Sequence, residues 1–563
     1  MHRLALALAL LLPTVATGGE REDAGAYLAG RHAQIRNDFA EAARYLAQGV
    51  RRDATNREML EGLIGAHMSL GDFDSAAAAA SRYVETGADN QIANLALATV
   101  AARDGAWTDL LDELEAGRSV GPLFDGLARG WALLGAERTD DALAAFDDLA
   151  GDGAVQAYGI YHKALALASL GRFDEAEALL SAEKDLRLTR RGLIARAQIL
   201  TQLGQGDRAV SVLLEGFGPD LDPMLADLRD RAASGETLDF TVAPDARAGM
   251  AEAAHDIAAA LADEVARGYT LLYSRAAQEL RPDHVEAALL SAALLDEMGQ
   301  YDLAIATYAA IPNDGPAHIA AELGRAEAML KADRKDAAIE VLRRLAQDRP
   351  DIAVVQAQLG DALRDLDRFA EARDAYDRAV ALFDTPQASQ WVVYFARAVT
   401  AERTGDWPAA EADFRRALDL NPDQPQVLNY LGYSLVERRE KLDEALDMIE
   451  RAVAARPDSG YIVDSLAWVF YKLGRYDEAV APMERAVQLT PVDPVLNDHL
   501  GDIYWAVGRH LEARFQWSRA LSFADNASEE DIDADRIRRK LELGLDAVLE
   551  EEGADPLKVA NDG

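Results

Sequence analysis

Two short glycine-containing segments resemble fragments of catalytic motifs. GQGDRA at residues 204–209 has part of the glycine spacing of a dinucleotide-binding loop, and GYSLV at residues 432–436 begins like a turn that presents a nucleophilic serine. A dinucleotide loop must follow a strand, whereas residues 204–209 lie between two expected helices. The second segment lacks the second glycine of the serine motif, and Ser434 lies inside an expected helix. Neither segment indicates an enzyme.

The remaining ionisable residues do not form a recognisable catalytic or metal-binding motif. None of the nine histidines has the HExxH spacing of a zinc site. His499 lies beside Asp498 and Asp502, which could form an oxygen-rich cluster, but we interpret it as a surface histidine in an acidic repeat. The absence of cysteine removes thiol nucleophiles, thiolate metal ligands and disulfides. We therefore predict no catalytic residue, no metal and no cofactor.

Aromatic and short polar side chains are concentrated in the last third of the chain, on three segments that we expect to be helical. Aromatic rings supply contact area, and short polar groups can hydrogen-bond an extended peptide backbone. The alternative is that the rings of Trp468, Tyr471 and Trp505 only pack between helices. The candidates for a binding groove are Asn429, Tyr433, Tyr461, Asp464, Trp468, Tyr471, Asp498, Asp502 and Trp505.

A repeated phrase positions these residues. Sequences such as LGRYDEAV at 473–480 recur with a small residue as anchor, mostly 34 residues apart and sometimes 32 to 38. One interval of 95 residues separates Ala209 from Ala304, and we interpret residues 251–282, with Ala277 as anchor, as a degenerate repeat inside it. The other anchors are Ala42, Ala76, Leu110, Ala142, Ala176, Ala338, Ala372, Ala410, Ala445, Ala479 and Ala513.

Each repeat reads as two helices joined by a corner. A small residue lies 12 positions before the anchor, as Gly360 and Gly501 do, and a bulky residue lies four positions after it, as Tyr376 and Trp517 do. The apolar steps of three and four residues favour helices. The small residues should let two helices approach closely while the bulky residue fills the space beside them. Gly or Asp at the corner is suited to ending the first helix.

This pattern of period and offsets resembles the tetratricopeptide repeat. The resemblance implies an all-α fold, a right-handed superhelix of about 13 to 14 helical hairpins, in which the first helix of each pair lines the concave side. Residues Ile532, Ile537, Leu541, Leu545 and Val548 predict a capping helix that covers the end of the array.

The chain divides into five predicted segments. Residues 1–18 have a short basic start, an apolar run and small residues, which is typical of a cleaved export signal, with cleavage after Ala16 or Gly18. Residues 19–216 form an N-terminal array, 217–250 an irregular Gly/Pro-rich connector, 251–526 a C-terminal array, and 527–563 a capping helix with an acidic tail. The alternative for 217–250 is a long loop on one continuous superhelix.

The net charge of −39 argues against nucleic-acid binding, because a phosphate backbone would be repelled. No segment after the signal is apolar for long enough to cross a membrane. Without cysteine there is no site for a lipoprotein anchor, so we predict a soluble periplasmic or secreted protein.

The C-terminal repeats carry a narrower resemblance. NYLGYSLVER (429–438), VDSLAWVFYKLGRYDEAV (463–480) and HLGDIYWAVGRHLEARFQWSRAL (499–521) resemble the closing repeats of bacterial periplasmic adaptors that bind carboxyl-terminal processing proteases and bring them substrates. The resemblance implies a protein-binding scaffold whose partners are such a protease and its substrates. Two alternatives remain open, a scaffold for pilus or polysaccharide export and a hydrolase that acts on the cell wall.

Overall fold

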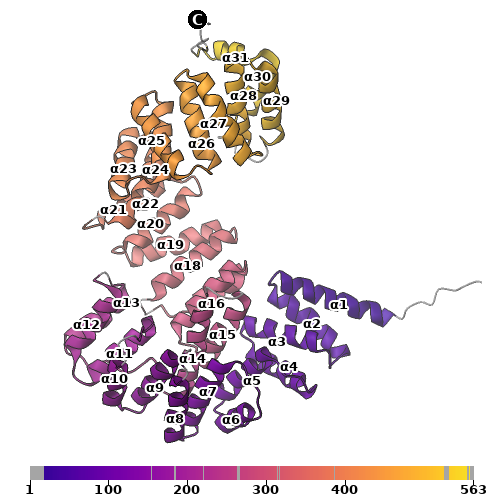
Figure 1. The fold of residues 1–563 in the computed structure, drawn as a ribbon, viewed down its shortest axis with the longest axis vertical. Helices are drawn as coiled ribbons and strands as arrows, with labels where there is room; N and C mark the ends of the chain where they lie inside the picture. The colour runs from indigo at the N-terminus through magenta and orange to yellow at the C-terminus, as the bar shows by residue number, and fades with distance from the viewer. Residues whose placement is uncertain are drawn as a thin grey trace, which may run out of the picture. The chain divides into compact units, whose positions relative to one another are not determined.

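The computed structural model describes residues 18–151, 153, 155–182, 186–219, 221–262, 267–313, 315, 317–385, 387–524, 532–554 and 557. The described chain is helical and contains no strand (Figure 1). It forms two compact units, residues 1–345 (unit 1) and 346–563 (unit 2), and the division falls inside helix α19. Almost all of the predicted export signal at residues 1–18 lies outside the described residues, and its cleavage stays a prediction. None of the described helices combines the length and the apolar character needed to cross a membrane.

The described residues of unit 1 form eighteen helices and the larger part of a nineteenth. They are α1 (Gly18–Ile35), α2 (Phe39–Arg52), α3 (Arg57–Leu70), α4 (Phe73–Glu85), α5 (Gln91–Arg103), α6 (Trp107–Glu115), α7 (Pro122–Gly135), α8 (Thr139–Ala150), α9 (Gln156–Ser169), α10 (Phe173–Ala182), α11 (Arg190–Gln202), α12 (Gly206–Phe217), α13 (Pro223–Ala233), α14 (Ala246–Leu261), α15 (Arg267–Leu280), α16 (Val285–Glu297), α17 (Tyr301–Ala309), α18 (Ala317–Lys331) and α19 (Lys335–Asp348).

Unit 2 continues the same alternation and adds one short 3-10 turn, η1 (Ala388–Gln390). Its helices are α20 (Ala353–Arg364), α21 (Phe369–Ala381), α22 (Trp391–Arg403), α23 (Trp407–Leu420), α24 (Pro425–Glu437), α25 (Leu442–Ala455), α26 (Gly460–Lys472), α27 (Tyr476–Leu489), α28 (Pro494–Ala506), α29 (His510–Ser522), α30 (Ala534–Leu543) and α31 (Leu545–Glu551).

Successive helices pair into hairpins, which confirms the predicted fold class. The described chain holds fourteen hairpins, with α13 standing between two of them and α30 and α31 following the last. Every predicted anchor lies on the second helix of a hairpin. All are completely buried except Leu110, which keeps 2% of its surface exposed. Residues 251–282, predicted to form a degenerate repeat, lie in the α14–α15 hairpin, with Ala277 fully buried on α15.

The small and bulky positions of the repeat meet as the sequence predicts. A Cβ atom on Gly360 would lie 2.6 Å from Cε1 of Tyr376, and one on Gly501 would lie 2.3 Å from Nε1 of Trp517. These separations are shorter than any van der Waals contact, so the ring of the second helix occupies the place of a side chain on the first. This packing fixes which face of each first helix turns toward its partner and which face stays available.

The corners also follow the prediction. The backbone enters the left-handed region at Gly474 (φ 75°) and at Asp367 (φ 58°). After each corner residue the next amide closes the helix end, as Arg475 does by donating to the carbonyl of Phe470 at 2.8 Å. Such closure satisfies carbonyl groups that the end of a helix leaves unpaired.

The predicted connector at 217–250 lies within unit 1. It contains helix α13 and the start of α14, and the α14–α15 hairpin packs back against earlier helices, α14 against α7 and α9 and α15 against α3 and α5. Gly249 on α14 permits this approach, because a Cβ atom there would lie 2.2 Å from Cδ2 of Trp131 on α7. The Gly/Pro-rich segment therefore marks a fold-back, whereas the compact units separate at residues 345–346.

The capping segment forms two helices instead of the single predicted one. Ile537, Leu545 and Val548 are buried as expected. The break comes at Gly544 (φ 88°), where a Cβ atom would lie 2.5 Å from Cζ2 of Trp505. Gly544 therefore ends α30 and starts α31. Its positive φ favours glycine, and the Trp505 ring leaves no room for a side chain there.

Candidate functional site

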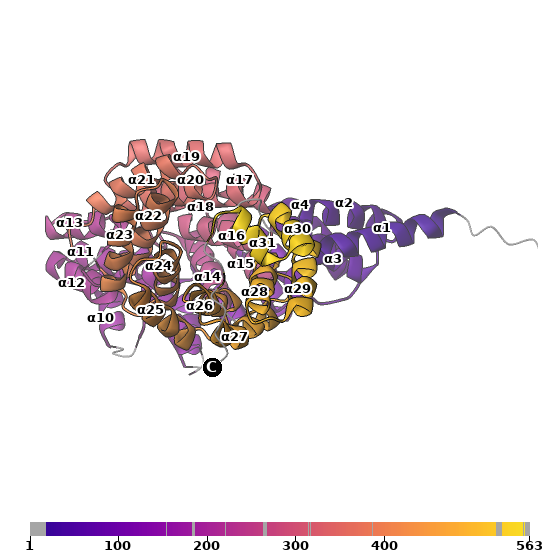
Figure 2. The ribbon, with the colours of Figure 1, turned by 90° about the horizontal axis from the view of Figure 1, so that it is seen from above.

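The nine predicted groove residues lie on the first helices of the last three hairpins. Figures 1 and 2 show α24, α26 and α28 following one another, with α30 and α31 next to the last hairpin. We call these nine residues the aromatic surface: Asn429 and Tyr433 on α24; Tyr461, Asp464, Trp468 and Tyr471 on α26; Asp498, Asp502 and Trp505 on α28.

The centre of the aromatic surface is a stack of three rings. The indole of Trp468 lies between Tyr471, at a centroid distance of 4.8 Å, and His499, at 3.8 Å, and both pairs are nearly parallel. The Nε1–H of Trp468 donates to Oε1 of Glu437 at 2.7 Å. Lys472 pairs with Glu437 at 3.1 Å and lies over the indole face. These contacts fix the ring in one orientation, and Trp468 keeps 9% of its surface exposed.

His499 is part of this stack and not a surface histidine, so that interpretation was wrong. Its Nδ1 lies 2.9 Å from Oδ1 of Asp464, and only 13% of its side chain is exposed. Burial opposes the charged imidazole, but the carboxylates of Asp464, Asp498 and Asp502 outweigh burial and raise the pKa of His499. Stacking on Trp468 and the contact with Asp464 fix the imidazole of His499, and the surrounding carboxylates favour its charged form.

Asp498 and Asp502 bind a residue of the capping helix. The Nζ of Lys540, whose side chain is completely buried, donates to Oδ2 of Asp498 at 2.8 Å and to Oδ1 of Asp502 at 2.7 Å. The Nε1–H of Trp517 donates to the same Oδ1 of Asp502 at 2.9 Å. Burial and the neighbouring charge of Asp502 raise the pKa of Asp498, against the opposing charge of Lys540. The two aspartates hold the cap.

Trp505 also contacts the helices that follow the last hairpin. Its Nε1–H donates to Oδ2 of Asp546 on α31 at 2.9 Å, and its ring stacks on His510 at 4.1 Å. At this end of the aromatic surface, Asp498, Asp502 and Trp505 contact the chain's own last helices. The alternative that the rings only pack between helices therefore applies to Trp505.

The outer part of the aromatic surface remains accessible. Tyr461 keeps 60% of its surface exposed, and Asn429, Tyr433 and Tyr471 are half-buried. Burial, then the charges of Glu437 and Asp464, raise the pKa of Tyr433, so its hydroxyl stays protonated and can donate. The Oδ1 atom of Asn429 is buried and has no hydrogen-bond partner among the described residues.

Sequence reasoning missed Glu437, His499 and Lys540 as members of this network. Glu437 and Lys472 were visible as an acid and a base on successive first helices. Their meeting across the indole depends on the angle between hairpins, which residue spacing does not give. Lys540 carried no signal, because a lysine in a charged helix is normally expected to face water.

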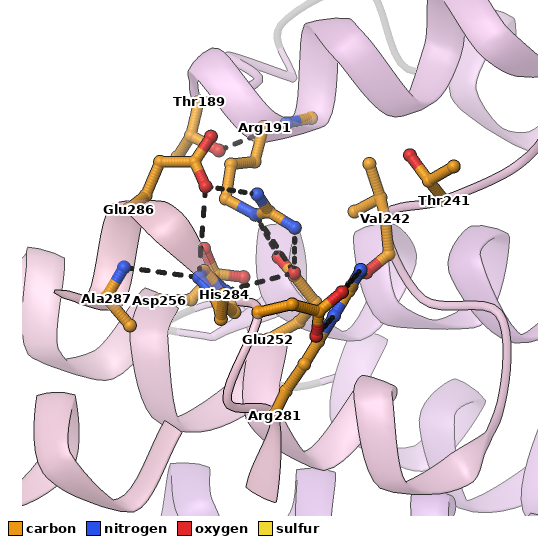
Figure 3. Close-up of polar contacts among 12 residues, drawn as sticks. Thr189, Arg191, Thr241, Val242, Glu252, Asp256, Arg281, His284, Glu286 and Ala287 are labelled. Atoms are coloured by element: carbon orange, nitrogen blue, oxygen red, sulfur yellow. Dashed lines mark hydrogen bonds and ion pairs between the residues drawn. The ribbon is translucent and has the colours of Figure 1, made fainter. Parts of the chain in front are cut away.

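A second concentration of ionisable groups is buried in unit 1 (Figure 3). We call Arg191, Glu252, Asp256, His284 and Glu286 the buried ion cluster. Arg191 on α11 donates from Nε to Oε2 of Glu252 on α14 at 2.8 Å, and from Nη1 to Oε2 of Glu286 on α16 at 2.6 Å. Burial alone would raise the pKa of Glu252, but Arg191 and then His284 bring it well below its usual range.

The bonding pattern assigns the proton on His284. The N–H of Ala287 donates to Nδ1 of His284 at 3.2 Å, so this nitrogen is an acceptor and the proton belongs on Nε2. That Nε2 lies 3.2 Å from Oε1 of Glu252, without the alignment of a hydrogen bond. His284 therefore faces the carboxylate of Glu252 with its Nε2–H.

A similar arrangement, a histidine between a donor and a carboxylate, is found next to the cluster. The Nε1–H of Trp131 donates to Nδ1 of His162 at 3.0 Å, and the other nitrogen of His162 lies 3.2 Å from Oδ2 of Asp256. The ring of His255 lies 4.7 Å from that of His284, and burial followed by the charge of His284 lowers the pKa of His255 to about 4.

The centre of the cluster combines acids and bases and is closed to solvent, whereas Arg191 and Glu286 keep 12% and 22% of their side chains exposed. Glu252 and His162 expose none of their surface, and His284 exposes 1%. In the part of the chain that the structure describes, no group of three or more acids and histidines is placed to hold a metal ion. The cluster joins the α14–α15 fold-back to α9, α11 and α16, and we assign it a structural role.

Comparisons with known proteins agree with the repeat pattern. A tetratricopeptide repeat model matches residues 27–91, 66–109, 127–187, 357–425, 395–460, 432–494 and 465–528, and a second tetratricopeptide repeat model matches residues 320–351. The TPR repeat-containing protein PA4667 of Pseudomonas aeruginosa is 28% identical over 183 residues, which are 32% of this chain and 30% of that protein. The chain thus matches about a third of the length of this relative.

Alignments with solved structures were also found. The structure of the APC/C hetero-tetramer Cut9–Hcn1 aligns over 93% of this chain and 96% of that one, with 14% identity and a TM-score of 0.38. MamA from Desulfovibrio magneticus RS-1 aligns over 31% of this chain and 97% of its own, with 17% identity and a TM-score of 0.28.

Proposed function

Because the chain belongs to the tetratricopeptide repeat family, we propose that it is a scaffold that binds other proteins, with the aromatic surface of unit 2 as a binding face. The observation that carries this proposal is the ring stack of Trp468, Tyr471 and His499, held by Glu437 and Asp464. Interface hot spots are enriched in rings of this kind, and a ring already fixed in place loses little conformational freedom on binding.

Tyr461 and Tyr433 provide the accessible contacts beside this rigid centre. Tyr461 projects from the first turn of α26, and the hydroxyl of Tyr433 can donate to a peptide carbonyl. Glu437 and Asp464 are already paired with Lys472 and His499, so they fix the rings and leave the accessible contacts to the tyrosines.

As the partner we propose a carboxyl-terminal processing protease of the cell envelope, together with the substrates that the scaffold would bring to it. Support comes from the likeness of residues 429–438, 463–480 and 499–521 to the closing repeats of the periplasmic adaptors of such proteases. The proposal places the protein in the periplasm or outside the cell and gives it no catalytic step of its own.

Substitution of Tyr461 tests the binding face directly. We expect Tyr461→Ala to weaken binding to a purified processing protease from the same organism about tenfold, as truncation of one accessible aromatic anchor does. Biolayer interferometry of the full-length protein measures this. The matched control is Phe515→Ala, since Phe515 is equally exposed (61%) but lies on the second helix of the last hairpin. Equal affinity of both variants would remove the aromatic surface as the binding face, and absence of binding by wild type would remove the protease as partner.

A further inference from the structure

Unit 1 contains an apolar pocket of about 360 Å³ between helices α4, α5 and α6, far in sequence from the aromatic surface. Its floor is buried, and its walls are partly open to solvent. The apolar lining consists of Val84, Leu97, Ala98, Ala101, Leu110, Leu114 and Val120.

The pocket also carries one buried polar group, the amide of Asn94. Its Nδ2 donates one proton to Oδ1 of Asp89 at 2.8 Å and the other to the carbonyl of Ser119 at 2.9 Å. Because both partners are acceptors, the orientation of the amide is fixed. Asn94 is 4% exposed, and its Oδ1 has no hydrogen-bond partner among the described residues. We call this site the Asn94 pocket.

An unpaired acceptor in an apolar site favours a ligand that brings a donor. Burying a carbonyl oxygen without a hydrogen bond is unfavourable, and an N–H or O–H group beside an apolar group would relieve this. The amide has no donor left to give, so a ligand that offers only acceptors gains nothing from it.

The rim of the pocket narrows the ligand further. It carries Glu85, Asp109 and Glu113, and the last of these pairs with Arg118. Two carboxylates thus remain beyond the one that Arg118 neutralises, which disfavours anions and admits neutral or cationic groups. The volume lies at the small end of ligand pockets, which span about 300–1,000 Å³.

We propose that the Asn94 pocket binds one aliphatic side chain of an extended peptide segment, whose backbone N–H donates to Oδ1 of Asn94. That the segment belongs to a partner protein rests on the proposed scaffold function; the binding chemistry rests on the pocket alone. The site would give unit 1 a binding contact of its own.

The probe for this proposal is N-acetyl-leucine-N′-methylamide, followed by saturation-transfer NMR with the full-length protein. We expect wild type to bind it at millimolar concentration and to bind the analogue methylated on both amide nitrogens at least fivefold more weakly. Ala101→Leu fills the pocket and should reduce binding at least tenfold. Ala78→Leu, on the exposed face of α4, should bind like wild type, and circular dichroism melts check that both variants fold.

Three results with the probe and the variants would overturn the proposal, and a fourth comes from leucinamide. The three are equal binding of the probe and its methylated analogue, retained binding by Ala101→Leu, and no binding to wild type at the solubility limit of the probe. Tighter binding of leucinamide, which has a free ammonium group, would assign the site to small amines and overturn the peptide. Because the probe is a free compound, failure here leaves the protease-binding test on unit 2 unaffected, and failure there leaves this result standing.

Discussion

Both units bury a cation between two carboxylates, but the electrostatic outcomes differ. In unit 1, Arg191 reaches Glu252 and Glu286 on two different helices, and the pKa of Glu252 falls. In unit 2, Lys540 faces Asp498 and Asp502, one turn apart on the same helix, and the pKa of Asp498 rises. A guanidinium fork satisfies two separated acids, whereas one ammonium leaves two adjacent acids in mutual repulsion. The carboxylates of unit 1 are therefore stable in their charged form at neutral pH. In unit 2, protonation of Asp498 at lower pH reduces the repulsion between the two aspartates.

The largest expected effect comes from removing the cation of unit 1. Arg191→Ala leaves Glu252 buried without a charged partner, and we expect a loss of about 3–5 kcal/mol in the free energy of unfolding at pH 7. Urea denaturation measures the loss, and hydrogen exchange should show it in α14. Arg44→Ala, which breaks an exposed pair with Glu41, is the control and should leave the free energy of unfolding nearly unchanged. Similar losses in both variants would contradict the assignment of a structural role to the buried ion cluster.

Removing the cation of unit 2 should cost less and should depend on pH. We expect Lys540→Met to lose about 2–3 kcal/mol at pH 7, because Asp498 is still partly exposed and can take up a proton. An aspartate with a raised pKa binds protons more tightly in the folded state, so the loss should shrink as the pH falls from 7 to 5. Thermal unfolding over this range measures it.

The matched rescue is the double variant Lys540→Met/Asp498→Asn, which removes the repulsion without acid. Recovery of most of the lost stability at pH 7 is expected. A loss that is the same at every pH, with no rescue, would mean that Lys540 acts only by filling space.

The smallest effect concerns His499, whose raised pKa makes its charge a source of stability. A raised histidine pKa contributes stability that is fully present below the unfolded value of about 6.5 and is lost as the pH rises through the folded value. His499→Gln should therefore lose more stability at pH 6 than at pH 9. The part that remains at pH 9, about 0.5–1.5 kcal/mol, reports the lost stacking on Trp468. Equal losses at both pH values would show that Asp464 does not hold a charged imidazole.

The repeat pattern was sufficient to predict the hairpins and their contacts. Ala372 with Gly360 and Tyr376 could be placed correctly, because each hairpin solves the same packing problem and repeats the same answer. The first helices that carry Tyr433, Trp468 and Trp505 followed from the same spacing. Their use as a binding face stays a prediction.

The fold-back of α14 and α15 could not be predicted in this way. Its ion pairs join residues 61 and 95 positions apart, Arg191 to Glu252 and Arg191 to Glu286. The repeat pattern predicts contacts between adjacent hairpins only, so it does not predict contacts over such separations. The engagement of Asp498 and Asp502 by Lys540 was missed for a related reason, since their charge suggests an open acidic surface until the cap is placed on it.

The bond between Lys540 and the two aspartates has a bearing on how such a chain can change its length in evolution. Tandem arrays usually grow or shrink by duplicating or deleting whole units. Here the capping helix α30 binds the last hairpin through Asp498 and Asp502. A duplicated last hairpin would bind the cap only if it kept both aspartates. Changes in the number of hairpins are thus constrained next to the cap, and insertions should be tolerated more readily upstream of it.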